Sequence, residues 1–186
     1  MKLPFFIAIL GFCAVLPKTL LAIAPSGLND KDLAQFDRIS EAIRRASSLT
    51  LFEGLPHLER EPDQSKNELA TKKTVRIHDY PFYEQPLALA PEDLDPLRRL
   101  SAAAETYSSY AGPKRCGGYH PDYGLAWKDG DSTYHLLICF GCQEMKLFGP
   151  KQELLADIRS DSFKQFESIL KKYRAQRPKN ETLSVR

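Results

Sequence analysis

The chain carries little net charge and lacks the short motifs that most often identify a function. Its 26 Lys and Arg residues nearly balance its 24 Asp and Glu residues, which leaves a formal charge of +2 at pH 7. No stretch combines dense basic side chains with stacking aromatic ones, so we expect no nucleic-acid partner. G-x-S-x-G, HExxH and glycine-rich phosphate-binding motifs are absent as well. The sequence therefore assigns no catalytic and no cofactor-binding residue, and a non-enzymatic role is favoured.

Long hydrophobic runs are also missing, apart from one near the N-terminus. Lys2 precedes an apolar stretch from Leu3 to Leu16, and Pro17-Lys18 interrupts it. The run stops short of the roughly 20 residues that a membrane span needs. Small residues at Ala22-Ile23-Ala24 match a cleavage pattern. We therefore expect residues 1–24 to be a signal peptide and the protein to be exported (periplasmic, cell-surface or secreted). Membrane contact would come only through an uncleaved signal segment.

Cysteine is scarce in the remaining chain. Three cysteines, Cys116, Cys139 and Cys142, lie beyond the expected signal peptide. The chain is long enough to bury a core in one ordinary domain, so it does not need disulfides to fold. We place that domain at residues 25–174 and expect a polar, frayed tail at residues 175–186.

The clearest strand pattern surrounds Asp129-Gly130, a dipeptide typical of a tight hairpin turn. Apolar and polar side chains alternate on both sides of it. One face of the predicted hairpin is aromatic and aliphatic and should be core; it comprises Tyr123, Leu125, Trp127, Tyr134, Leu136, Ile138 and Phe140. The opposite face carries His120, Asp122, His135 and Cys139.

Two registers are compatible with this hairpin, and they place the same residues on the same faces. A two-residue Asp129-Gly130 turn pairs Trp127 with Ser132 and His120 with Cys139. A four-residue loop shifts the pairing by two and places Asp122 opposite Cys139. A third strand over residues 143–148 follows in either case.

The rest of the chain mixes helix and strand patterns without regular alternation, which predicts an α+β fold rather than a doubly wound sheet. We expect an antiparallel sheet in which the Cys-bearing hairpin, residues 122–148, packs against several helices. The expected helices cover residues 29–46, 91–108, 151–158 and 161–174, and further strands cover 48–53 and 74–79. Residues 59–73 are charged and lack a core pattern, so we expect a surface loop there, with a helical turn within it as an alternative.

Three short motifs suggest a relationship to other proteins. They are GLPH at residues 54–57, CGGYHPDY at 116–123 and CFGCQE at 139–144. With these motifs the sequence resembles a group of uncharacterised exported bacterial proteins. The resemblance implies export and an intact cysteine block, and it carries no activity with it.

The cysteines allow three interpretations. The first is one disulfide among Cys116, Cys139 and Cys142, with one thiol left over. The second is a structural zinc site formed by Cys116, His120, Cys139 and Cys142, a Cys₃His set that zinc accepts. The third is thiol–disulfide exchange by the Cys139–Cys142 pair, although the pair follows a strand and lacks an activating helix N-terminus.

The sequence therefore predicts an exported single-domain protein that binds or scaffolds, with a structural Cys/His cluster. An exported thiol–disulfide oxidoreductase that uses Cys139 and Cys142 is the alternative. We interpret His57 and His78, near the ends of strands, as hydrogen-bonded structural residues.

Overall fold

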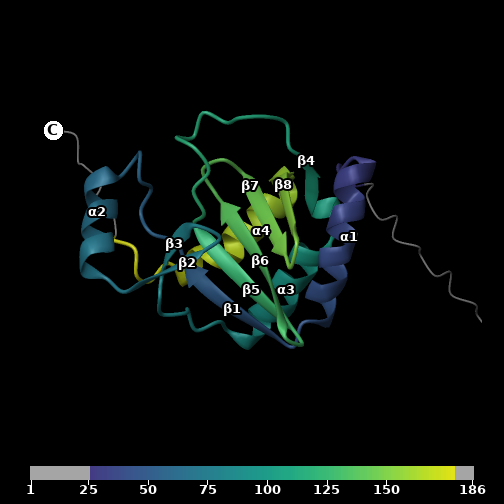
Figure 1. Cartoon of the computed structure of the whole chain (residues 1–186), viewed down its shortest axis with the longest axis horizontal. Helices are drawn as coiled ribbons and strands as arrows, with labels where there is room; N and C mark the ends of the chain where they lie inside the picture. The colour runs from purple at the N-terminus through teal and green to yellow at the C-terminus, as the bar shows by residue number, and fades with distance from the viewer. Residues whose placement is uncertain (1–25, 179–186) are drawn as a thin grey trace, which may run out of the picture.

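A computed structural model describes residues 26–178 and shows a mixed α+β fold built on one large antiparallel sheet (Figure 1). The helices are α1 (Asp30–Arg45), α2 (Pro62–Thr71), α3 (Pro91–Ala102) and α4 (Ser160–Leu170), with 3-10 turns η1 (Ala104–Thr106) and η2 (Lys171–Tyr173). The strands are β1 (Ser48–Glu53), β2 (Thr74–Ile77), β3 (Tyr80–Tyr83), β4 (Tyr107–Ser109), β5 (Tyr123–Asp129), β6 (Ser132–Cys139), β7 (Glu144–Gly149) and β8 (Gln152–Ile158). The six-stranded sheet has the order β1-β5-β6-β7-β8-β4, and β2 and β3 form a separate two-stranded sheet.

The predicted apolar face of the hairpin is the centre of the main core. Trp127, Leu125 and Leu136 are fully buried there. They belong to the same cluster as Phe36 of α1 and Phe166 of α4. The alternation of side chains in β5 and β6 therefore identified the buried face correctly.

Helix α1 begins and ends where the sequence indicates. Asn29 is the N-cap, and its side chain accepts a hydrogen bond of 3.0 Å from the backbone N–H of Asp32. Acidic residues occupy the first turn, and Arg44 and Arg45 occupy the last, which complements the helix dipole. Its apolar stripe packs across the sheet and against α3.

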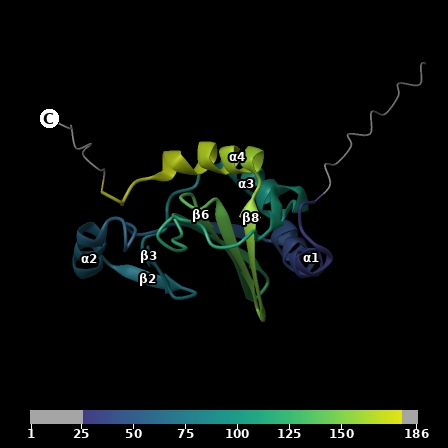
Figure 2. The same cartoon turned by 90° about the horizontal axis from the view of Figure 1, so that it is seen from above.

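The opposite face of the large sheet is partly covered by the β2–β3 hairpin. Figure 2 shows α1 and α3 on one side of the sheet and β2, β3 and α2 on the other. Ile77 and Phe82 of the small hairpin pack with Leu137 and Phe148 of the large sheet in a second apolar cluster. The hairpin turns at His78-Asp79, where both residues have positive φ values of 49° and 69°, as a two-residue type I′ turn requires.

The register of β5 and β6 is the second of the two predicted pairings. Trp127 lies opposite Tyr134, and Asp129 lies opposite Ser132. The turn therefore consists of Gly130 and the residue after it, one position later than a turn centred on Asp129-Gly130. Gly130 has φ of 57° as the first turn residue, which is the glycine position of a type II′ turn.

Three expected elements were wrong or incomplete. Residues 152–158 form β8 rather than a helix, because pairing with β7 buries every second side chain and overrides the helix-favouring composition. The helix from Pro91 ends at Ala102, and Tyr107–Ser109 turns back to pair with β8 as β4. Residues 62–71, expected as a loop, form α2, whose buried face is polar and so shows no hydrophobic pattern.

The predicted signal peptide lies outside the described residues. Within residues 26–178, no helix is both long and apolar enough to cross a membrane.

Candidate functional site

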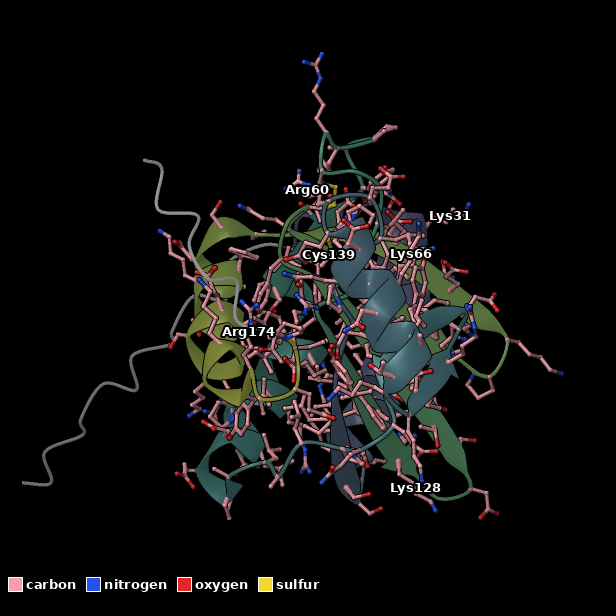
Figure 3. All side chains as sticks on the ribbon, turned by 90° about the vertical axis from the view of Figure 1, so that its left-hand side faces the viewer. Lys31, Arg60, Lys66, Lys128, Cys139 and Arg174 are labelled. Carbon is pink, nitrogen blue, oxygen red and sulfur yellow. A yellow bond between two sulfur atoms is a disulfide. The ribbon has the colours of Figure 1, made fainter. Side chains whose placement is uncertain are left out.

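The three cysteines of the described chain lie together at one end of the large sheet. A disulfide joins Cys116 to Cys142, with Cα atoms 5.6 Å apart. Cys139 keeps a free thiol and is 2 % exposed; Figure 3 labels it among the packed side chains. Tyr119 packs against this cluster. Of the disulfides that the sequence left open, the structure has the one between the loop before β5 and the turn after β6.

Local backbone geometry explains this pairing. Gly117 and Gly118 have φ values of 83° and 87°, which fold the chain back directly after Cys116. On the other side, the turn between β6 and β7 carries Cys142, whose backbone N–H donates to the Sγ of Cys139 over 3.3 Å. The glycine pair and the turn thus bring the sulfur atoms of Cys116 and Cys142 within bonding distance.

The remaining thiol is shielded and weakly acidic. Burial raises the pKa of the Cys139 thiol above its usual value, and the carboxylates of Asp122 and Glu144 act in the same direction. Backbone hydrogen bonds from His120 and Cys142 lower the pKa but do not cancel the effect of burial. Cys139 is therefore protonated and a poor nucleophile in this state.

The zinc hypothesis required free thiolates at Cys116, Cys139 and Cys142 together with His120. In this structure the sulfur atoms of Cys116 and Cys142 are bonded to each other. Among residues 26–178, no group of three or more His, Cys, Asp or Glu side chains is arranged to hold a metal ion. The zinc site therefore concerns only a reduced form of the protein, for which it stays a prediction.

His57 of the GLPH motif lies beside His120, with ring centroids 4.7 Å apart. The Nδ1 of His57 accepts the backbone N–H groups of Glu59 and Arg60 at 3.1 and 3.3 Å. The proton of a neutral ring must then lie on Nε2. This Nε2 is buried and has no hydrogen-bond partner in the described part of the chain. It faces Gly117, where an added Cβ would lie 3.4 Å from it.

His120 is held as a neutral imidazole. Its pKa is lowered to about 4, mainly by burial; the Asp122 carboxylate opposes this shift, and the Arg177 guanidinium and His57 add to it. The Nε2 of His120 lies 3.5 Å from Nη2 of Arg177. Because a guanidinium only donates hydrogen bonds, this Nε2 is an acceptor and the ring proton is on Nδ1.

Arg177 connects three segments that are distant in the sequence. Its Nη1 pairs with Oδ1 of Asp122 at 2.8 Å, and its Nε and Nη2 donate to the carbonyl of Gly54 at 3.1 and 3.0 Å. The other carboxylate oxygen of Asp122 accepts the backbone N–H of Phe140 at 2.6 Å. One guanidinium thus joins the GLPH segment to the HPD segment, and Asp122 extends the network to the turn that contains Cys142.

A second carboxylate, that of Glu53, anchors the same C-terminal segment. Glu53 is 1 % exposed at the end of β1. Its two oxygens accept the backbone N–H groups of Ala175, Gln176 and Arg177 at 3.1, 2.7 and 3.2 Å. These residues belong to the segment that the sequence predicted to be a frayed tail, so its first part is instead tied to the domain.

A separate pair of histidines joins the β2–β3 turn, which contains His78, to His135 of β6. The Nε2 of His78 is 3.0 Å from the Nδ1 of His135, and the His78 ring stacks on Phe148 at 3.8 Å. Burial lowers the pKa of His135 to about 4 and also lowers that of His78. An open hollow of about 590 Å³ adjoins the pair, with Tyr80 and Lys146 in its lining.

Sequence reasoning found the cysteines and His120 but missed the groups that pair with them. Glu53 could have been found from the sequence. It falls on the same strand face as the apolar Leu51, and a carboxylate that points into the core needs hydrogen-bond donors. No sequence pattern marks Arg177 or Glu144 as a site residue, because their contacts depend on long-range packing. His57 was interpreted alone, although its stacking on His120 joins two of the three motifs.

Comparison of the chain with protein-family models, with curated proteins and with solved structures gives no match. The resemblance carried by the three motifs therefore stays a prediction, and the site is interpreted from its own geometry.

We predict that Glu53→Gln releases the C-terminal segment. The amide keeps one acceptor oxygen but loses the charge that holds three N–H groups, and hydrogen bonds to charged groups contribute about 1.5–3 kcal/mol each. Denaturant unfolding should show a loss of about 2–3 kcal/mol, and trypsin should cut faster after Arg174. Glu84→Gln, an exposed change nearby, is the control. Equal tryptic rates in the two variants would show that Glu53 does not hold the segment.

Acidification should destabilise the protein partly through His120. The folded-state pKa of about 4 lies below the ordinary value of 6.5, so the unfolded chain binds a proton first as pH falls. Stability is then lost between pH 6.5 and 4, by roughly 1–3 kcal/mol from this residue. His120→Gln should flatten the midpoint-versus-pH curve over this window. His135→Gln should flatten it independently, and an unchanged slope in the His120 variant would contradict the assignment.

Proposed function

We propose that the chain is an exported single-domain module that binds or scaffolds, and that its Cys/His cluster is structural. One observation carries the proposal. The disulfide joins Cys116 and Cys142, 26 positions apart in the sequence, and the thiol of Cys139 is buried beside it. Such a bond holds a long loop against the sheet. Structural disulfides typically stabilise a fold by closing a long loop in this way.

The surroundings of the cluster support the same conclusion. The hydroxyl of Tyr119 donates to the carbonyl of Leu137 at 2.6 Å and accepts the backbone N–H of Lys146 at 3.1 Å. The loop that carries Cys116 is thus held to β6 and β7 by hydrogen bonds as well as by the disulfide. Groups that are mutually satisfied in this way favour a rigid framework over a reacting centre.

The hollow beside His78 is the best candidate for a binding surface. Its volume of about 590 Å³ lies within the range of small-molecule sites. It combines an aromatic ring, Tyr80, with the charged groups of Lys146 and Glu153, which pair at 2.9 Å. Lys146 also lies over the Tyr80 ring at 5.6 Å. A few polar groups beside aromatic surface are typical of a ligand site.

The oxidoreductase alternative has less support. It requires Cys139 and Cys142 to act as the redox pair, but Cys142 is bonded to Cys116. Burial raises the pKa of Cys139, whereas a reactive cysteine normally has a lowered pKa. The turn that holds the pair links two strands, so no helix N-terminus activates either sulfur.

Removing the disulfide should lower stability without removing an activity. For a loop of 26 residues the chain-entropy relation gives about 3.5 kcal/mol, so the Cys116→Ser/Cys142→Ser double variant should lose roughly that much in denaturant unfolding. Cys139→Ala keeps the bond and is the control. Wild-type protein should not accelerate dithiothreitol-driven insulin reduction. Acceleration that disappears in the double variant would favour the oxidoreductase instead.

The hollow can be tested with two simple probes of different chemistry, benzoate and p-nitrophenyl β-glucoside. At millimolar concentration, amide NMR shifts should concentrate at Tyr80, Lys146 and Phe148, because these residues meet at the hollow. Tyr80→Ala should abolish the shifts, and Tyr110→Ala, a change away from the hollow, should leave them intact. Shifts spread over other surfaces, or none with either probe, would count against this binding surface.

A further inference from the structure

A free thiol lies directly beside the disulfide. The Sγ of Cys139 accepts the backbone N–H of Cys142 at 3.3 Å. Bond lengths within a cysteine then place the sulfur atoms of Cys139 and Cys142 no more than about 7 Å apart. Cys139 ends β6 and Cys142 lies in the turn that follows, and a Cβ added at the intervening Gly141 would meet no atom within 4 Å. A bond between the two sulfur atoms requires rotation of the two cysteine side chains.

A carboxylate with an unused oxygen faces the same thiol. Glu144 is the direct cross-strand partner of Cys139, so the two side chains lie on one face of the sheet. Glu144 is 4 % exposed, and within residues 26–178 its Oε1 has no hydrogen-bond partner. The nearest cation is Lys114, whose Nζ lies 3.9 Å from that oxygen. Burial raises the pKa of Glu144, which makes its carboxylate a better proton acceptor than an exposed one.

The far side of the disulfide borders a hollow at the surface. Cys116 and Cys142 line a hollow of about 410 Å³ together with Lys114 and Arg115. Lys114 also pairs with Asp157 at 2.9 Å. A thiolate that formed on Cys116 would share this hollow with Lys114 and Arg115, whose positive charges favour it, and with Asp157, whose charge Lys114 offsets.

We propose that the three cysteines form an internal thiol–disulfide relay in which Glu144 acts as the base. The carboxylate of Glu144 takes the proton of Cys139. The resulting thiolate attacks the Sγ of Cys142, so that a Cys139–Cys142 bond forms as the Cys116–Cys142 bond breaks. The electron pair leaves on Cys116, which becomes a thiolate in the hollow and takes up a proton. One disulfide and one thiol are present before and after, so no outside oxidant or reductant takes part.

The relay gives the cluster an activity beyond the structural role proposed above. It moves the free thiol from Cys139, which is 2 % exposed, to Cys116, which is 5 % exposed and lines the hollow. It also unties the loop that carries Cys116 from the turn between β6 and β7. The relay is independent of the hollow beside His78, so failure of either proposal leaves the other standing.

Irreversible trapping of the new thiol tests the relay. Purified wild-type protein is incubated with iodoacetamide at pH 8, quenched in acid, digested without reduction and mapped by mass spectrometry. The relay predicts carbamidomethyl groups on Cys116 together with a Cys139–Cys142 disulfide. Label on Cys139 with the original disulfide intact would mean direct access to the buried thiol and would overturn the relay. So would an absence of label over a period in which urea-unfolded protein labels fully.

Two variants separate the parts of the mechanism. Glu144→Gln should slow labelling of Cys116 at least tenfold, whereas Glu41→Gln, an exposed change on α1, should leave the rate unchanged. Equal rates would remove Glu144 as the base.

Cys116→Ser, treated with oxidised glutathione, should form the Cys139–Cys142 disulfide. Two free or separately glutathionylated thiols would show that Cys139 and Cys142 cannot form this bond, and this result would overturn the relay. The Cys116 test does not depend on whether the Glu144 variant folds.

Discussion

The burial of one carboxylate, that of Glu53, determines where the last described segment of the chain packs. An ionised carboxylate is very costly to bury unless donors compensate it. The nearest part of the sequence supplies none, and three successive N–H groups at residues 175–177 supply them instead. This demand places Arg177 over the carbonyl of Gly54 and beside Asp122. The last described residues are therefore required for the polar end of the sheet to be satisfied.

The three motifs converge because of this charge arrangement. His57, His120 and the CFGC turn are far apart in the sequence, yet each contacts Arg177 or a group that Arg177 pairs with. Both histidines stay within the packed structure, and His120 is kept neutral because burial lowers its pKa to about 4. Arg177 contacts the loop before β5 at His120 and Asp122, and the disulfide fixes the same loop at Cys116. Most polar groups here satisfy one another, which is why we favour a framework role.

The periodicity of the sequence predicted secondary structure correctly where one period fits the pattern of apolar residues. It failed where the choice between helix and strand depends on pairing with a distant strand. Trp127 and Leu125 follow a period of two, and their burial was predicted correctly. Residues 152–158 also have a period of two in burial, but Leu154-Leu155-Ala156 reads equally well as a helix, and only the partner strand β7 decides. Helix α2 shows no hydrophobic pattern in the sequence for a different reason. Its inward contact is a hydrogen bond from Tyr83 to Glu68 rather than an apolar stripe. The cysteine cluster was predictable because the hairpin returns the chain to its own start. Arg177 was not, because no local pattern marks its partner.

The position of the disulfide has a consequence for the stability of the end of the sheet. In the chain-entropy picture, a bond that closes 26 residues stabilises the folded state by about 3.5 kcal/mol. A bond between Cys139 and Cys142 closes a loop of only a few residues and contributes about 2 kcal/mol. The isomer reached through the relay would therefore resist unfolding less, although both isomers contain one disulfide. The long-range bond suits a resting state, and the short one suits a looser state in which the loop before β5 is free. In the proposed relay, Glu144, which is buried opposite Cys139 and also lies 3.9 Å from the Nζ of Lys114, is the base that would start the exchange between the two isomers.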